Sequence, residues 1–231
     1  DVNDQTPTYT ATSTTPTVTE GATAVDTDVA ITDTDTGDSN TCTKGGADAD
    51  LFTCTVTATA YSVAFSSAPD YDSGTACAGG NSCTVTIKIN DGAQDGATIT
   101  YTITIADAND QTPAVTVDSS YATAEATTVF QTFTIVDTDT TGAYGCTLGG
   151  ADSAAFSKTV TGKNCVVSWD SARDYDAAHA DANGDGTYEL TIAFTDGTNN
   201  LGAQSTDVTV TDVNDQTPTY TATSTTPTVT E

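Results

Sequence analysis

The residues best able to do chemistry in this 231-residue chain are acidic, and they recur in a fixed order. A heptad of the form DxNDQTP begins at residues 1, 107 and 212, at intervals of 106 and 105 residues. Within each interval follow a glutamate, a DTD pair, a DYD pair and a single aspartate. These are Glu20, Asp33, Asp35, Asp70, Asp72 and Asp91, and then Glu125, Asp137, Asp139, Asp174, Asp176 and Asp196. Carboxylate oxygens are hard ligands, so this repetition favours cation binding over a merely solvated acidic surface.

The charge balance restricts the possible partners. The chain has 5 basic and 32 acidic residues, a formal net charge of −27. Such an excess disfavours nucleic acids and anionic membrane surfaces and favours cations. No continuous apolar run is long enough to span a bilayer, so we expect no membrane insertion in this segment. No signal peptide is visible, and we expect any export signal or anchor to lie outside these residues.

Short alternating runs predict the elements that must position the acidic residues. Apolar residues occupy every second position in three stretches, with threonine filling many of the positions between them. The stretches are Val85, Ile87 and Ile89; Ile99, Tyr101, Ile103 and Ile105; and Leu190, Ile192 and Phe194. This period is typical of half-buried strands rich in β-branched residues. The chain is therefore expected to be all-β, and strands over 98–106 and 203–210 should lead directly into the second and third heptads.

The repetition also predicts the domain organisation. Residues 212–231 repeat residues 1–20 letter for letter. We expect one domain over residues 1–106, a second over 107–211, and the first strand of a further repeat over 212–231. A chain of this kind is expected to be a segment of a longer tandem array.

The even count of six cysteines in a threonine-rich, strand-rich chain indicates disulfides and an oxidising, extracellular or cell-surface location. The second repeat holds one pair, Cys146 and Cys165. The four cysteines of the first repeat allow three pairings, of which short loop spacing favours Cys42–Cys54 and Cys77–Cys83. Metal binding by the cysteines is the weaker interpretation, because the chain has no CxxC pair and one histidine.

Taken in order, the glutamate, the DXD pair, the DXE-like pair, the TDG-type aspartate and the DXNDX linker resemble the cadherin repeat. The resemblance covers essentially the whole chain. It implies tandem seven-stranded Greek-key sandwiches of immunoglobulin-like type, with up to three calcium ions between successive domains. Two departures are visible: the linker has Gln111 where the family usually has asparagine, and Asp72 and Asp176 replace a glutamate. The shorter side chains are expected to alter calcium affinity rather than abolish it.

The resemblance also implies which residues bind calcium. The complete junction comprises Glu20, Asp70, Asp72, Asp107, Asn109, Asp110, Asp137, Asp139 and Asp196. A downstream half-junction comprises Asp1, Asn3, Asp4, Asp33, Asp35 and Asp91. An upstream half-junction comprises Glu125, Asp174, Asp176, Asp212, Asn214 and Asp215. The two halves are complementary, as a continuing array would require.

One acidic stretch lies outside these sets. In DANGDGTYE, residues Asp181, Asn183 and Asp185 have the i, i+2, i+4 spacing of an EF-hand loop, with Gly186 next. Position 12, which should supply a bidentate glutamate, is Ile192. An extra calcium site and an ordinary glycine-rich hairpin loop both remain open interpretations.

These patterns predict a structural segment of a secreted or cell-surface protein, a rod or filament stiffened by calcium and used for adhesion or matrix. Neighbouring copies of the repeat are the expected partners. The alternatives are a recognition module for a cell-surface glycan or another cadherin-like surface, and an accessory region of an extracellular enzyme. Catalysis is not expected, because paired carboxylates recur with the domain period and His179 has no apparent catalytic partner.

Overall fold

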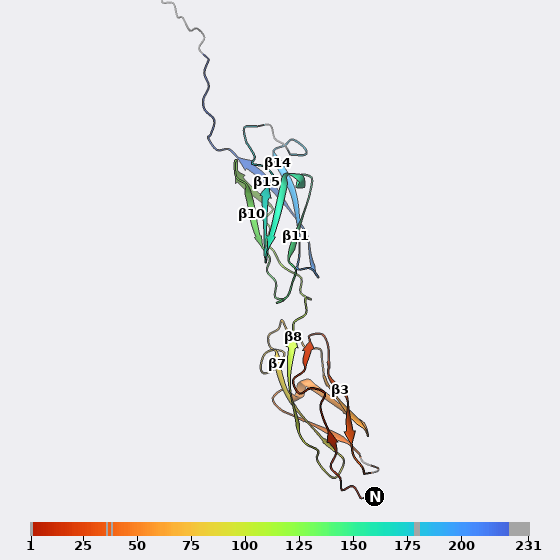
Figure 1. Ribbon diagram of the computed structural model, residues 1–231. Coiled ribbons are helices and arrows are strands. Elements are labelled where there is room, and N and C mark those ends of the chain that lie inside the picture. The colour runs from red at the N-terminus through yellow and green to blue at the C-terminus, as the bar shows by residue number, and fades with distance from the viewer. Residues whose placement is uncertain (1, 36, 38, 178–180, 222–231) are drawn as a thin grey trace, which may run out of the picture. The chain divides into compact units, whose positions relative to one another are not determined.

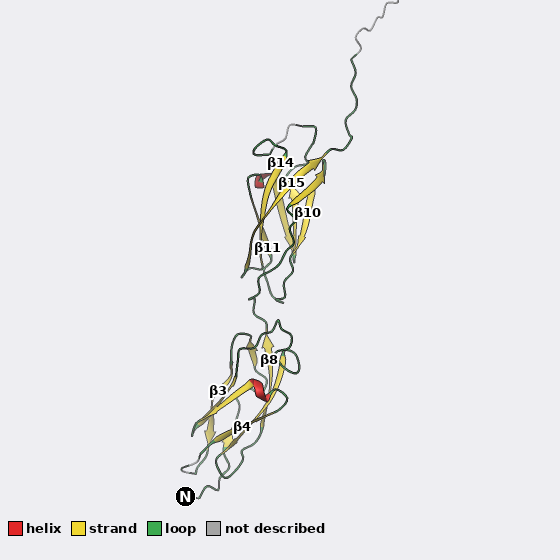
Figure 2. Cartoon of the chain, turned by 180° about the vertical axis from the view of Figure 1, so that it is seen from behind, coloured by secondary structure: helices red, strands yellow, loops and turns green. Residues whose placement is uncertain are grey.

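The computed structural model describes residues 2–221, apart from residues 36, 38 and 178–180. The chain divides into two compact units, and each is described separately. The first comprises Asp1–Gln111 with Asp137–Gly142, and the second comprises Thr112–Val136 with Ala143–Glu231. The loop with Asp137 and Asp139, which belongs to the second sequence repeat, is therefore part of the first unit. Strands and loops make up almost all of both units, with two short helical turns (Figure 2).

The first unit has two four-stranded sheets, with strand orders β1-β3-β6-β5 and β2-β8-β7-β4. Strands β2 and β8 are parallel, and the other neighbours are antiparallel. The strands are β1 (Thr8–Tyr9), β2 (Thr17–Thr19), β3 (Ala24–Thr32), β4 (Thr41–Gly45), β5 (Phe52–Val56), β6 (Ala60–Phe65), β7 (Ser82–Asn90) and β8 (Ile99–Ala106). A 3₁₀ turn, η1 (Ala49–Leu51), precedes β5.

The second unit repeats this arrangement with sheets ordered β10-β13-β12 and β11-β14-β15-β9. Figure 1 labels β10, β11, β14 and β15 of this unit. Its strands are β9 (Ser120–Ala124), β10 (Val129–Thr134), β11 (Gly145–Gly149), β12 (Phe156–Thr161), β13 (Asn164–Trp169), β14 (Thr187–Thr195) and β15 (Asn200–Thr211). A 3₁₀ turn, η2 (Ser153–Ala155), precedes β12. An isolated bridge between Ala114 and Val136 takes the place of the β1–β3 pairing.

The alternating sequence pattern explains why these strands pack as a sandwich. In β8 the side chains of Tyr101, Ile103 and Ile105 are at most 1% exposed, while the threonines between them face solvent. A pleated strand sends successive side chains to opposite faces, so one face enters the core. The all-β sandwich and the predicted last strands are confirmed. Strand β15 begins at Asn200, three residues earlier than expected, because it continues a hairpin with β14.

Aromatic residues fill the core of the second unit. The rings of Phe156 and Trp169 stack with centroids 4.3 Å apart, and Tyr188 meets Trp169 edge-on at 4.9 Å. Trp169 is 4% exposed, and Phe65 in the first unit is 5% exposed. Burial of these large apolar rings supplies much of the hydrophobic stabilisation of each unit.

All three expected disulfides are present: Cys42–Cys54, Cys77–Cys83 and Cys146–Cys165. Cys42 on β4 and Cys54 on β5 join the two sheets of the first unit. In the second unit Cys146 on β11 bonds to Cys165 on β13, so this disulfide also joins the two sheets but does so through a different pair of strands. No cysteine in the described part of the chain is free.

Residues 212–221 contain no strand, and 222–231 lie outside the described residues. The identical residues Thr8 and Tyr9 form β1 because they pair with Thr32 and Ile31 of β3. The copy at Thr219 and Tyr220 has no such partner strand among the described residues. The further repeat therefore stays a prediction. Among the described residues, none of the helices has the length and apolarity needed to cross a membrane.

Candidate metal centre

A buried glutamate organises the end of each unit. Glu20 is 8% exposed and accepts hydrogen bonds from Tyr71 N (2.6 Å) and Ala108 N (2.7 Å). Glu125 is 5% exposed and accepts from Tyr175 N (2.7 Å) and Val213 N (2.6 Å) in the equivalent way. Each carboxylate therefore ties the DYD segment to the residues that follow the last strand. A carboxylate oxygen has more than one lone pair, so these oxygens can also bind a cation.

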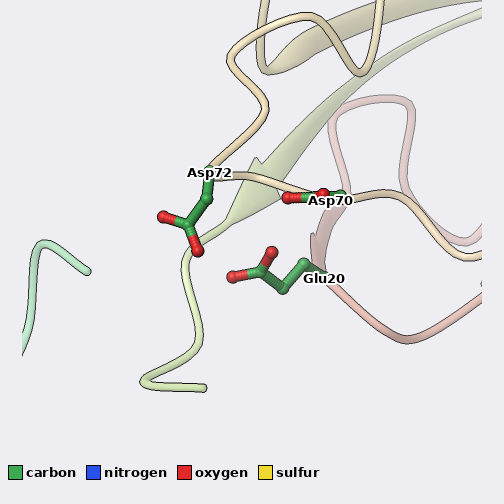
Figure 3. A group of neighbouring side chains, drawn as sticks. All are labelled: Glu20, Asp70 and Asp72. Carbon is green, nitrogen blue, oxygen red and sulfur yellow. The ribbon is translucent and has the colours of Figure 1, made fainter. Parts of the chain in front are cut away.

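Three carboxylates converge in the first unit. Oxygen atoms of Glu20, Asp70 and Asp72 all lie within 4.8 Å of one another. In Figure 3 the three carboxylates face a common space. Glu20 follows β2, whereas Asp70 and Asp72 come from the loop between β6 and β7. These residues were all predicted as calcium ligands, and the fold brings them together from positions about 50 residues apart.

Asp72 also belongs to a second group in the first unit. One ligand oxygen each of Asp72, Asp107 and Asp139 lies within 4.8 Å of the others. Asp107 accepts hydrogen bonds from Thr140 N at 2.5 Å and from the Thr140 hydroxyl. Asp139 is 1% exposed and accepts from Gln111 N at 3.0 Å. The loop 137–142 and the residues after β8 are thus held together by hydrogen bonds to carboxylates.

The two groups fit a calcium ion because particular oxygens in them are buried without a hydrogen-bond donor. Both carboxylate oxygens of Asp72, and Oδ1 of Asp107, are buried and have no hydrogen-bond partner. A buried carboxylate without a partner costs free energy unless a proton or cation neutralises it. Hard oxygen ligands at flexible geometry are the donor set of calcium. Asp72 lies in both groups, so it is the side chain on which the candidate centre depends most.

The electrostatics of the cluster show the same deficit of positive charge. Burial, followed by repulsion from Asp139, Glu20, Asp107 and Asp110, raises the pKa of Asp72 to about 6. Burial also raises the pKa of Asp139 above its ordinary value, with a further contribution from neighbouring aspartates, although the Gln111 N–H opposes it. Close carboxylates disfavour one another's ionised form. A bound divalent cation would reverse this effect.

These shifts predict an unusual pH dependence in excess chelator. The folded-state pKa of Asp72 lies above its ordinary 3.8, so the folded chain binds more protons than the unfolded chain between these values. Stability is expected to fall as pH rises from about 4 to about 6.5, by a few degrees in melting temperature after allowance for solvent screening. Scanning calorimetry across this range tests the effect. A flat or rising profile, or an equal fall in Asp72→Asn, would contradict it.

The downstream half-junction is assembled at the start of the first unit. Asn3 Nδ2 donates to the backbone oxygen of Asp91 at 3.2 Å, and the N–H groups of Asp4 and Gln5 donate to Asp35 Oδ2, each at 2.7 Å. Buried oxygens without hydrogen-bond partners again occur here: Asn3 Oδ1, Asp33 Oδ2 and Asp91 Oδ2. Asp1 was also predicted and lies outside the described residues.

The upstream half-junction lies at the end of the second unit and is more exposed. Asp176, Asp212, Asn214 and Asp215 line one shallow depression together with Val213 and Gln216. Burial raises the pKa of Asp176, with repulsion from Asp212, Glu125, Asp215 and Asp174 adding to the effect. Asp174 is occupied by the N–H groups of Asp176 and Ala177. Four of the six predicted residues thus line one depression, and the other two lie beside it: Glu125 contacts Val213 N and Asp174 contacts Asp176 N.

The remaining predicted ligands lie outside the strands of their own units. Asp196 is fully buried, and its Oδ1 accepts from Thr198 N and Asn199 N, each at 2.7 Å. Asp137 lies in the 137–142 loop of the first unit, where its Oδ1 accepts from Asp139 N at 3.3 Å. Asp110 is exposed and accepts from Gln111 Nε2 at 2.7 Å. Asn109 is half-buried, and His179 lies outside the described residues.

Sequence reasoning missed two carboxylates that hold a loop in place. Asp48 accepts from Ala78 N and Thr84 N, each at 2.7 Å, and is 5% exposed. Asp152 is equally buried and accepts from Ala182 N at 2.5 Å and Glu189 N at 2.8 Å. Both are the last residue of the repeated GGAD tetrapeptide. That repetition was the available signal, and it marks a structural role that ligand motifs do not describe.

Comparison with solved structures places this fold among cadherin extracellular domains. The EC22–24 segment of mouse cadherin-23 matches with a TM-score of 0.65 and 22% identity over 92% of this chain and 68% of that one. The EC3–6 cis-dimer structure of protocadherin gammaB7 gives 0.63 and 18% over 91% and 49%. Human protocadherin-24 EC1–2 gives 0.60 and 18% over 90% and 99%. The chain therefore has a cadherin-like fold, and it spans 49% of the protocadherin gammaB7 structure and 34% of the protocadherin GammaB4 extracellular domain.

The sequence-based comparisons give no further match. No protein-family profile matches the chain, and no curated protein matches it. At identities near 20% the structural likeness shows the fold alone.

Proposed function

We propose that this chain is a structural segment of a secreted or cell-surface protein, in which calcium bound at the repeat junction converts successive repeats into a stiff rod used in adhesion or matrix. The observation that carries the proposal is Asp72, whose two oxygens are buried without partners in the middle of converging carboxylates. Such an arrangement is costly unless a cation is present. The cadherin-like fold supports the same conclusion by analogy.

The charge of the cluster explains how calcium would act mechanically. Without a cation, the carboxylates of Glu20, Asp72, Asp107 and Asp139 repel one another. Repulsion favours conformations in which the linker and the 137–142 loop separate. A divalent ion turns the same groups into shared ligands and favours the closed arrangement. Calcium would therefore act on the mechanics of the array, and neighbouring repeats would be its partners.

Small-angle X-ray scattering of the 231-residue chain tests the stiffening. With calcium we expect one narrow distribution of end-to-end distances, and with excess chelator a broader one of smaller mean dimension. The variant Asp72→Asn should stay broad at calcium concentrations that order the parent chain. Asp28→Asn removes the same charge at an exposed position with φ of 54°, which asparagine also adopts, and should behave as the parent. Superimposable profiles with and without calcium would refute the stiffening.

A further inference from the structure

The two units close the same loop in different ways. In the first unit the segment before β7 is held by the Cys77–Cys83 disulfide and by hydrogen bonds from Ala78 N and Thr84 N to Asp48. In the second unit the segment before β14 makes the same pair of backbone contacts to Asp152, from Ala182 N and Glu189 N. These matched contacts align Ala182 with Ala78. Asp181 therefore stands where the first unit has Cys77.

The substituted residue is a buried carboxylate of which the protein satisfies only one oxygen. Asp181 is 9% exposed, so its side chain is about nine-tenths buried. Its Oδ2 accepts from Asp185 N at 2.8 Å, which directs the carboxylate toward the 181–185 turn, while Oδ1 has no hydrogen-bond partner. A buried oxygen of an ionised carboxylate that has no donor is stabilised by a nearby cation. In the first unit the equivalent residue, Cys77, is bonded to Cys83 and carries no charge, so it needs no cation.

A second carboxylate faces the same loop from β14. Glu189 Oε2 is also buried without a hydrogen-bond partner. The Asp152 carboxylate lies within hydrogen-bond reach of Glu189, so either one of the two side chains holds a proton or a cation neutralises them. Glu189 lies eight residues after Asp181, at the ninth position of an EF-hand-type loop, where an oxygen ligand is expected. The sequence spacing showed that position 12 lacks a glutamate. The fold brings a different glutamate, Glu189, to the loop at position 9.

The rest of the loop has the shape that such a site needs. Gly186, at the sixth position, has φ of 84°, which permits the sharp turn. The Asn183 amide nitrogen donates to Asp185 Oδ2 at 3.1 Å and to Glu189 Oε1 at 3.0 Å. It thus bridges two carboxylates that would otherwise repel each other. The Asn183 oxygen accepts from Asp185 N at 3.0 Å, so the amide must rotate and give up that contact to bind a cation between the two carboxylates, while Asp185 N keeps its bond to Asp181 Oδ2.

We propose that the loop 181–189 binds one calcium ion through Asp181, Asn183, Asp185 and Glu189, and that this ion stabilises in the second unit the loop that the Cys77–Cys83 disulfide stabilises in the first. All four ligands belong to the second unit. The ion is separate from those proposed at the junction, and its binding does not depend on the stiff-rod function. The affinity expected is that of extracellular calcium modules, with dissociation constants of about 10⁻⁴–10⁻³ M.

Nuclear magnetic resonance of the ¹⁵N-labelled 231-residue chain tests the site directly. Calcium is added to about 10 mM, above the weakest affinity expected, and the amide signals of Gly184 and Gly186 are followed. We expect a saturable shift of both signals in the parent chain. In Asp185→Asn, an exposed position, the affinity measured at these glycines should fall about tenfold or more, because a charged ligand is lost. Asp181→Asn should have the same effect.

Two control variants separate this site from the junction. Asp118→Asn removes one charge from an exposed loop of the same unit and should leave the glycine shifts unchanged. Asp72→Asn should also leave them unchanged, while it alters calcium-dependent shifts at Gln111. Glycine shifts that are absent in the parent chain, that persist in Asp185→Asn, or that disappear in Asp72→Asn would each overturn the proposal. If the junction proposal fails and this one holds, calcium-dependent shifts will be absent at Gln111 and present at Gly184 and Gly186.

Discussion

Calcium is expected to raise the melting temperature of the first unit by about 10–20 °C, and Asp72→Asn is expected to remove most of that rise. One ion at about 100 times its dissociation constant adds roughly 2.7 kcal/mol to the free energy of unfolding. Each kcal/mol corresponds to roughly 4–8 °C for a domain of 60–100 residues. The two groups that share Asp72 would supply the ligands for at least one such ion.

The same substitution should have the opposite effect in chelator. Burial and four neighbouring carboxylates disfavour the ionised form of Asp72, so neutral asparagine relieves repulsion when no cation is present. The melting curves of parent and variant should therefore cross: the variant melts higher in chelator and lower in calcium. Scanning calorimetry in both conditions tests this, with Asp28→Asn as the matched control. A variant that melts lower in both conditions would show that Asp72 has a purely structural role.

Asp48→Asn is expected to lower the melting temperature of the first unit by about 10–25 °C, equally in calcium and in chelator. The Asp48 carboxylate accepts two buried backbone N–H groups. Asparagine keeps the shape but offers one acceptor, and its amide nitrogen would face an N–H donor. Loss of a charge-assisted hydrogen bond and an unsatisfied buried donor cost about 2–4 kcal/mol together.

The position of the single tryptophan allows this effect to be assigned to one unit. Trp169 lies in the core of the second unit, so its fluorescence reports unfolding there, while circular dichroism reports both units. The Asp48→Asn loss should appear by circular dichroism and leave the tryptophan transition unchanged. Asp50→Asn, two residues away and exposed, should be neutral. A shift of the tryptophan transition, or a loss of only one or two degrees, would argue against the assigned role.

Local pattern was sufficient to predict the strands and the disulfides. The alternation of Ile99, Tyr101, Ile103 and Ile105 predicts one buried face, and the observed β8 buries the last three of them. Short spacing between cysteines favours local pairing because closing a short loop costs little entropy. These features depend on neighbours in the chain, so they are visible without the fold. The order of the acidic motifs was likewise sufficient to predict a cadherin-like sandwich.

Contacts between distant residues required the tertiary structure. The sequence shows that Glu20 and Asp72 are acidic, but only the sandwich brings their carboxylates together and leaves both Asp72 oxygens buried without partners. Burial is a property of the whole core, so neither the raised pKa of Asp72 nor its central position follows from spacing. Asp48 and Asp152 illustrate the same limit, because their hydrogen-bond donors lie 30 or more residues away.

The acidic loop of the second unit shows most clearly what each level determines. The spacing of Asp181, Asn183 and Asp185 left a calcium site and a plain hairpin equally open, because position 12 is apolar. The fold places Ile192 in the core and supplies Glu189 from the start of β14. The sequence by itself therefore determined the types of the candidate ligands, the repeats and the strand pattern. The tertiary structure decided which oxygens are buried together, since that depends on how strands distant in the chain pack.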